Sequence, residues 1–246
     1  EGVMTVSGRD TVWENSGDDI RLGYVRTMGT LFIDNGAAVR NAAGAILGRS
    51  NSYLRGSTGI VSVSGAGSRW TNQGSLVVGG NSLYEDSMPA VGELTVTDGA
   101  YVSSAVGNLG GNNADIRAYG GSGTATISGS DGDGNASTWE IANELVVGVG
   151  GSIGRGTGTL TISDGGLVSA GSVQIAQRNL STGTINIGAA VGDAATAAGT
   201  LSTPTIAFGA GNGLLNLNYL DASYVVDSAI SGQGKIAHNG SGVTHF

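Results

Sequence analysis

Residues 92–109 read GELTVTDGAYVSSAVGNL, and residues 158–175 follow the same plan as GTLTISDGGLVSAGSVQI. Each stretch opens with alternating apolar and polar residues, passes through Asp-Gly, and continues with two further short apolar segments. Such alternation is typical of a strand with one buried face, and Asp-Gly is typical of a tight turn. Each stretch therefore predicts three short strands separated by turns.

The opening pattern, Gly-x-apolar-polar-apolar, recurs along the chain at intervals of 25 to 35 residues. A three-stranded unit of this length cannot bury its apolar face alone, so successive units must stack. We predict an all-β fold, a right-handed parallel β-helix (β-solenoid) with three short strands per rung and about nine rungs spaced ~4.8 Å apart. The second apolar residue of each opening pattern is expected to form one inward ladder, which comprises Val6, Ile33, Val63, Val96, Ile127, Ile162 and Ile187.

Composition agrees with many short strands and turns. Glycine occurs 46 times and proline twice, while hydrophobic residues make up 39% of the chain, which excludes a disordered linker. The net charge is −8 with a single lysine, Lys235, so the chain has no electrostatic footprint for nucleic acid or an anionic membrane. Cysteine is absent, which excludes a disulfide framework. The chain opens and closes within strand patterns, and we expect it to be a fragment.

The units alternate between one form with tryptophan in the second strand and one form without it. Trp13, Trp70 and Trp139 occur once per pair of units. A row of tryptophans could stack sugars, but such residues are more often large packing elements, and we favour the packing role.

Two segments carry a family resemblance. Residues 59–79, GIVSVSGAGSRWTNQGSLVVG, resemble the passenger repeats of large autotransporter adhesins. Residues 213–243, with Ala229-Ile-Ser-Gly-Gln-Gly-Lys-Ile236 and Gly240-Ser-Gly-Val243, look like the autotransporter-associated β-strand repeat. We accordingly divide the chain into passenger repeats over 1–198 and continuing rungs of the second type over 199–246.

The resemblance implies a passenger domain of a type V secretion system, displayed on the outer face of a Gram-negative cell. It also implies an outer-membrane β-barrel that lies outside this chain, with no direct membrane insertion of the chain itself. Members of this family are mostly adhesins or self-association factors.

The sequence does not point to an enzyme. The two histidines, His238 and His245, lie in the last repeat, and no Gly-x-Ser-x-Gly motif precedes a helix. Carboxylate pairs of the kind used by polysaccharide-active β-helices are the stronger alternative. However, Asp34, Asp98 and Asp164 are expected at the same turn, where Asp bonds its own backbone.

No metal and no cofactor are predicted. The segment Asp131-Gly-Asp133-Gly-Asn135 places oxygen ligands at alternate positions, as in a Ca²⁺ loop. It lacks the glycine and the glutamate that such a loop requires further on, because Ala136 and Ala142 stand there. A solvated turn is therefore the better interpretation.

Chain length varies most between the third strand of one unit and the first strand of the next. These connections carry six of the ten arginines, four of the seven tyrosines and three acidic residues. Because insertions in a solenoid emerge on one face, and because Arg and Tyr are enriched at recognition surfaces, we predict a ligand-contact edge. Its candidate residues are Arg49, Tyr53, Arg55, Tyr84, Arg117 and Tyr119.

The expected function is that of an adhesin or a self-association factor in aggregation and biofilm formation. The expected partners are host glycans, a matrix protein or another copy of the chain, with no nucleic acid. Two alternatives remain at this stage: a passive β-helical stalk that presents another domain, and a polysaccharide-active β-helix enzyme.

Overall fold

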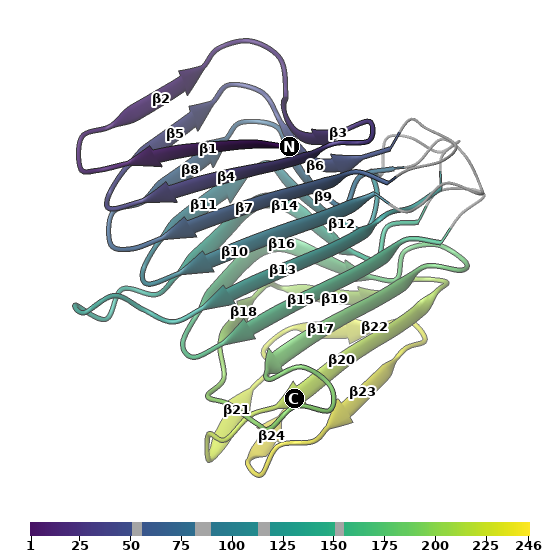
Figure 1. Cartoon of the computed structure of the whole chain (residues 1–246). Helices are drawn as coiled ribbons and strands as arrows, with labels where there is room; N and C mark the ends of the chain where they lie inside the picture. The colour runs from purple at the N-terminus through teal and green to yellow at the C-terminus, as the bar shows by residue number, and fades with distance from the viewer. Residues whose placement is uncertain (51–55, 82–89, 113–118, 151–154) are drawn as a thin grey trace.

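The computed structural model describes residues 1–50, 56–81, 90–112, 119–150 and 155–246. The regular elements in these ranges are β-strands that stack in parallel along one axis, which is a parallel β-helix (Figure 1). The predicted fold class is confirmed. No helix of the length and apolarity needed to cross a membrane is present among the described residues.

The first strand of every rung belongs to one parallel sheet of nine strands, which matches the expected number of rungs. In stacking order they are β1 (Gly2–Ser7), β4 (Met28–Asp34), β7 (Thr58–Ser64), β10 (Val91–Thr97), β13 (Ser122–Ser128), β15 (Thr157–Ser163), β17 (Thr182–Gly188), β20 (Asn212–Asn218) and β23 (Lys235–His238).

The second and third strands form a separate sheet of 13 strands that folds around the same interior (Figure 1). Its second strands are β2 (Val12–Asn15), β5 (Ala38–Asn41), β8 (Arg69–Asn72), β11 (Tyr101–Ser104) and β18 (Thr200–Ser202). Its third strands are β3 (Ile20–Tyr24), β6 (Ala45–Arg49), β9 (Ser75–Val78), β12 (Val106–Leu109), β19 (Thr205–Phe208) and β22 (Ala229–Ser231). A small two-stranded sheet near the C-terminus pairs β21 (Ser223–Val225) with β24 (Val243–His245).

In the fifth and sixth rungs, the second and third strands are continuous instead of separate. They form β14 (Thr138–Val147) and β16 (Leu167–Ile175). The pairing of β14 with β16 shifts register between Ile141 and Glu144, so the bend that separates two strands elsewhere becomes an irregularity within one strand.

The inward ladder of the first sheet is confirmed. Val6 pairs with Ile33, and the register continues through Val63, Val96 and Ile127 to the later rungs. Val6 is 5% exposed and the other six members are at most 1% exposed. Burial of each aliphatic side chain contributes about 1.5–3 kcal/mol to folding.

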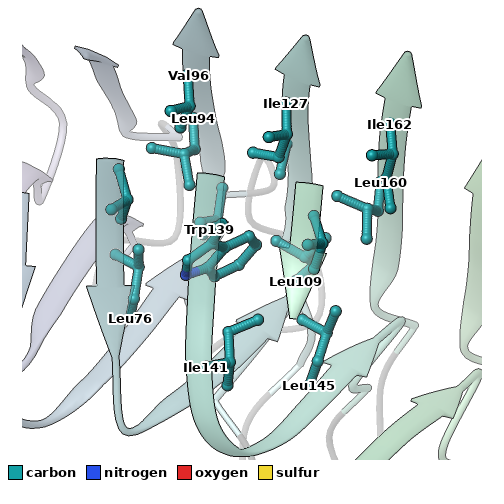
Figure 2. Packing of buried hydrophobic residues seen from close by; sticks show 14 of the residues in the cluster. Leu76, Leu94, Val96, Leu109, Ile127, Trp139, Ile141, Leu145, Leu160 and Ile162 are labelled. Carbon is teal, nitrogen blue, oxygen red and sulfur yellow. The ribbon is translucent and has the colours of Figure 1, made fainter. Parts of the chain in front are cut away.

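The tryptophans occupy one ladder of the second sheet, in which tryptophan alternates with valine. Val39 lies between Trp13 and Trp70, and Val102 lies between Trp70 and Trp139. Trp70 and Trp139 are fully buried, and Figure 2 shows Trp139 pointing into the apolar interior. The packing role is therefore confirmed for these two, while Trp13 is half-buried against the same core.

A small residue on the fourth rung makes room for the Trp139 ring. A Cβ added to Gly107 would lie 3.0 Å from the Trp139 ring and 2.9 Å from Leu145. A glycine in the fourth rung thus leaves the space that the indole of the fifth rung fills.

The glycine that opens each of the second to seventh units is required by a close approach between backbones. A Cβ on Gly123, in β13, would lie 2.6 Å from the Gly110 nitrogen and closer still to the Val78 carbonyl oxygen. Gly92 and Gly158 stand in register with Gly123 and are equally confined by backbone atoms. These glycines bring the corner after the third strand directly against the first sheet.

The turns after the first strands adopt the left-handed conformation that Asp-Gly favours. Asp98 and Gly99 have φ of 57° and 79°, and the Ala100 N–H donates to the Thr97 carbonyl at 3.1 Å. Asp164 stands in the same place with φ of 52°. Asp34 does not stand at this turn position as expected, because Asn35, with φ of 54°, occupies it one residue later.

Candidate functional site

The variable connections leave the β-helix side by side from one edge. The last residues of successive third strands stand in register, with Tyr24 beside Arg49, Val78 beside Leu109 and Val147 beside Ile175. In Figure 1 all the described parts of these connections lie on the same side of the stack. The geometry therefore gathers the variable connections between third and first strands into a single edge of the molecule.

The structure describes two of the six candidate contact residues. Arg49 ends β6, is half-buried, and its carbonyl accepts a hydrogen bond of 3.0 Å from the Val25 N–H. Tyr119 is half-buried just before β13. The remaining four, Tyr53, Arg55, Tyr84 and Arg117, lie outside the described residues.

A cluster of arginine and tyrosine occurs at the N-terminal end of this edge. The Arg21 guanidinium lies 5.9 Å from the centroid of the Tyr24 ring, and Tyr24 pairs in register with Arg49. Arg21 also lies 4.0 Å from Asp19. Sequence reasoning did not include Arg21, because it belongs to the strand and not to the connection that follows.

The described ends of the connections pack back against the third strands. Ile46, Val77 and Val146 occupy the alternate, outward positions of these strands, yet they are at most 7% exposed. Gly80 lies directly over Ile46, because a Cβ on Gly80 would come within 3.0 Å of the Ile46 side chain. A second, smaller apolar layer therefore lies outside the main core at this edge.

Polar side chains stack within this outer layer as well. The Asn112 N–H donates to Asn81 Oδ1 at 2.8 Å, and Asn81 Nδ2 donates to the Asn112 carbonyl at 3.2 Å. Asn81 is buried, and a Cβ on the intervening Gly111 would approach both Asn81 and Val149. The base of the edge is therefore an ordered stack of residues from successive rungs.

The Asp131 segment is an exposed turn in which the carboxylate serves the backbone of its own loop. Asp131 Oδ1 accepts from the Asp133 N–H at 3.0 Å and the Asn135 N–H at 2.8 Å, and Oδ2 accepts from Asn135 Nδ2 at 2.8 Å. These hydrogen bonds, led by the side chain of Asn135, hold the pKa of the Asp131 carboxyl below its usual value. The loop geometry is consistent with the solvated turn expected from the sequence.

Together the geometry defines a β-helical scaffold with one elaborated edge. No family model matches the chain, and no solved structure matches it. The chain is 30% identical over 242 residues to the adhesin BmaC autotransporter of Brucella suis biovar 1 (strain 1330), an alignment that covers 98% of this chain and 6% of that protein.

A second similarity covers a shorter segment. The chain is 41% identical over 93 residues to the uncharacterized lipoprotein YdeK of Escherichia coli (strain K12), which is 34% of this chain and 7% of the relative. The chain thus spans less than a tenth of the length of either curated protein. The first similarity agrees in part with the resemblance found from the repeats, namely with an adhesin of the autotransporter kind.

Proposed function

We propose that this chain is a segment of the surface-exposed passenger of an autotransporter adhesin, and that it acts in adhesion or self-association through the edge that carries its variable connections. The observation that carries the proposal is the similarity to an autotransporter adhesin along 98% of the chain. The edge supports it, because a β-helix whose only task is to hold another domain away from the cell does not need long connections gathered on one side.

The partners we propose are host glycans, a matrix protein or another copy of the chain, bound at the cell surface. Arginine and tyrosine suit such contacts, because guanidinium groups pair with anionic groups and aromatic rings supply rigid area. The described part of the edge places Arg21, Tyr24 and Arg49 next to one another, on a chain whose net charge is −8.

We propose binding rather than catalysis. An enzyme of this fold would need carboxylates on adjacent rungs, whereas the turn residues Asp98 and Asp164 lie on the fourth and sixth rungs and each holds a turn position with positive φ. A polysaccharide-active enzyme remains the alternative if hydrolysis or elimination of a glycan can be measured.

The test compares three forms of the chain displayed on a non-adherent bacterium: the parent, the triple variant R49S/R55S/R117S, and the off-edge control R9S/R40S/K235S. Both variants lose three positive charges, but only the first loses them at the edge. We expect the edge variant to lose cell adhesion or aggregation and the control to keep it. Because dissolved salt screens attraction between charged groups at protein surfaces, raising the salt should weaken the parent's adhesion.

Equal adhesion by the parent and the edge variant would contradict the proposal and favour a passive stalk. Circular dichroism of the purified variants checks that each substitution leaves the β-helix folded.

A further inference from the structure

A shallow groove of about 270 Å³ lies on the outer face of the 13-stranded sheet, where the chain turns from second to third strands in the third to fifth rungs. Its lining consists of Asn72, Gln73, Tyr101, Ser103, Ser104, Ala105, Glu140 and Ala142. The groove lies in the middle of the stack, and none of these residues belongs to the variable connections.

The groove exists because the fourth rung has small residues at this bend. Ser103, Ser104 and Ala105 form its floor, whereas Gln73 on one neighbouring rung and Glu140 on the other extend beyond it. Successive rungs of a parallel stack lie ~4.8 Å apart, so the two long polar side chains flank the floor on both sides.

Tyr101 forms a wall that is held by one contact at its hydroxyl and one over a face of its ring. Its hydroxyl donates to Glu140 Oε2 at 2.7 Å, and the Arg69 guanidinium lies 5.2 Å from the centroid of its ring. Partial burial, together with the hydrogen bond to Glu140, raises the pKa of the Tyr101 hydroxyl above its usual value, so it stays protonated as a donor. A wall held in this way loses little conformational entropy when a ligand packs on it.

The polar groups of the groove divide into two sets. Asn72 donates to the Ser103 carbonyl at 3.3 Å, and Ser104 Oγ accepts from the Trp139 indole at 3.2 Å, so both serve the protein interior. The side-chain amide of Gln73 makes no hydrogen bond to any described residue. Tyr101 occupies only one oxygen of the exposed Glu140 carboxylate. A planar amide and a carboxylate oxygen therefore face the same small space.

We propose that this groove binds one neutral sugar residue, with the Gln73 amide and the Glu140 carboxylate bonding its hydroxyls and the Tyr101 ring packing against its C–H face. Adjacent hydroxyls of a sugar are donors and acceptors at once, which an amide and a carboxylate match. The volume lies just below the ~300–1,000 Å³ of drug-sized sites, which leaves room for one sugar residue.

The sugar is neutral because the groove disfavours an anion. Glu140 is the one charged residue in the lining of the groove, and the whole chain is acidic with a net charge of −8. A carboxylated sugar would bring a like charge to within a few ångströms of Glu140, which is unfavourable even near the surface. This site goes beyond the adhesive edge and does not depend on it, since the two lie on different parts of the rung.

The inference is tested by titrating the ¹⁵N-labelled 246-residue chain with D-glucose, D-galactose, D-mannose and N-acetyl-D-glucosamine as neutral probes, and with D-glucuronate and N-acetylneuraminate as acidic probes. We expect at least one neutral probe to shift the amide signals of Gln73, Ser103, Ala105 and Ala142 in a saturable way. The dissociation constant should be on the order of 1–10 mM, as befits one sugar in a shallow site.

The variant Q73A/E140A should weaken this binding at least about tenfold, because it removes both polar walls while leaving the buried floor intact. The matched control Q233A/E93A changes the same two residue types at exposed positions elsewhere and should bind like the parent. The proposal is overturned if no neutral probe gives saturable shifts at the groove, if only the acidic probes do, or if Q73A/E140A binds as tightly as the control. Loss of adhesion at the edge with intact groove titration would separate the two sites.

Discussion

Replacing Gly123 with alanine is expected to destabilise the β-helix strongly, although it adds a single methyl group. The two backbone atoms nearest to the new Cβ are the Val78 oxygen and the Gly110 nitrogen, which are joined by a hydrogen bond of 2.9 Å. The methyl group would therefore overlap both atoms of that hydrogen bond. Either the hydrogen bond breaks or the first sheet moves away from the corner.

The change in unfolding free energy follows from two costs and one smaller gain. Forcing extra volume into a packed site costs about 1–3 kcal/mol, and leaving a buried hydrogen-bonding group without a partner costs about 1–3 kcal/mol more. Alanine recovers about 0.4–1 kcal/mol by restricting the unfolded chain. The net loss of unfolding free energy should be about 3 kcal/mol, which lowers the Tm of a chain of this size by about 6–12 °C.

The control is Gly132→Ala, because a Cβ there meets nothing within 4 Å and the residue lies in the exposed Asp131 turn. This change should alter the unfolding free energy by at most about 0.5 kcal/mol. Urea and thermal unfolding followed by circular dichroism measure both variants. If G123A unfolds within about 0.5 kcal/mol of G132A, the close approach of corner and sheet does not control stability, and the argument for the opening glycines is wrong.

Two further results are expected. Placing a carboxylate in the ladder by Val96→Asp or Ile127→Asp should unfold several neighbouring rungs together, because stacked rungs share one core. Limited proteolysis should then cut the chain over a wide region. Unchanged protease resistance would argue against a continuous core. The Asp131 turn should be intact above the usual carboxyl pKa and should loosen as the pH falls through the lowered pKa of Asp131, since protonation removes the hydrogen-bond acceptor. The amide chemical shifts of Asp133 and Asn135, followed between pH 6 and pH 2, measure this loosening. A transition above pH 4 would contradict the prediction.

The stacked architecture could be predicted from the sequence because its determinants are local and repeat. Alternation in the first strand identifies the inward residues, such as Val96 and Ile127, and the Asp98-Gly99 pair marks the turn. Seven copies of one pattern leave little freedom in register, because a slip of one residue would expose every member of the ladder.

The outer layer at the edge could not be predicted in the same way. Ile46, Val77 and Val146 stand at positions that alternation assigns to solvent, and what covers them comes from connections whose length and sequence differ between rungs. A signal was present, since residues 45–47 (AIL) and 145–147 (LVV) are consecutive apolar residues rather than alternating ones. The sugar groove depends likewise on side chains from three rungs, which no single repeat contains.

The close contact between the opening glycines of the second to seventh units and the corner that precedes each of them also keeps changes in the connections from displacing the strands. The corner is fixed by backbone contacts at Gly79 and Gly92, immediately before and after the connection between them. A connection can therefore be lengthened, shortened or replaced without shifting the register of the strands. The backbone contacts thus constrain the rungs and leave the connections at this edge free to change, so a new contact surface can arise there while the fold stays the same.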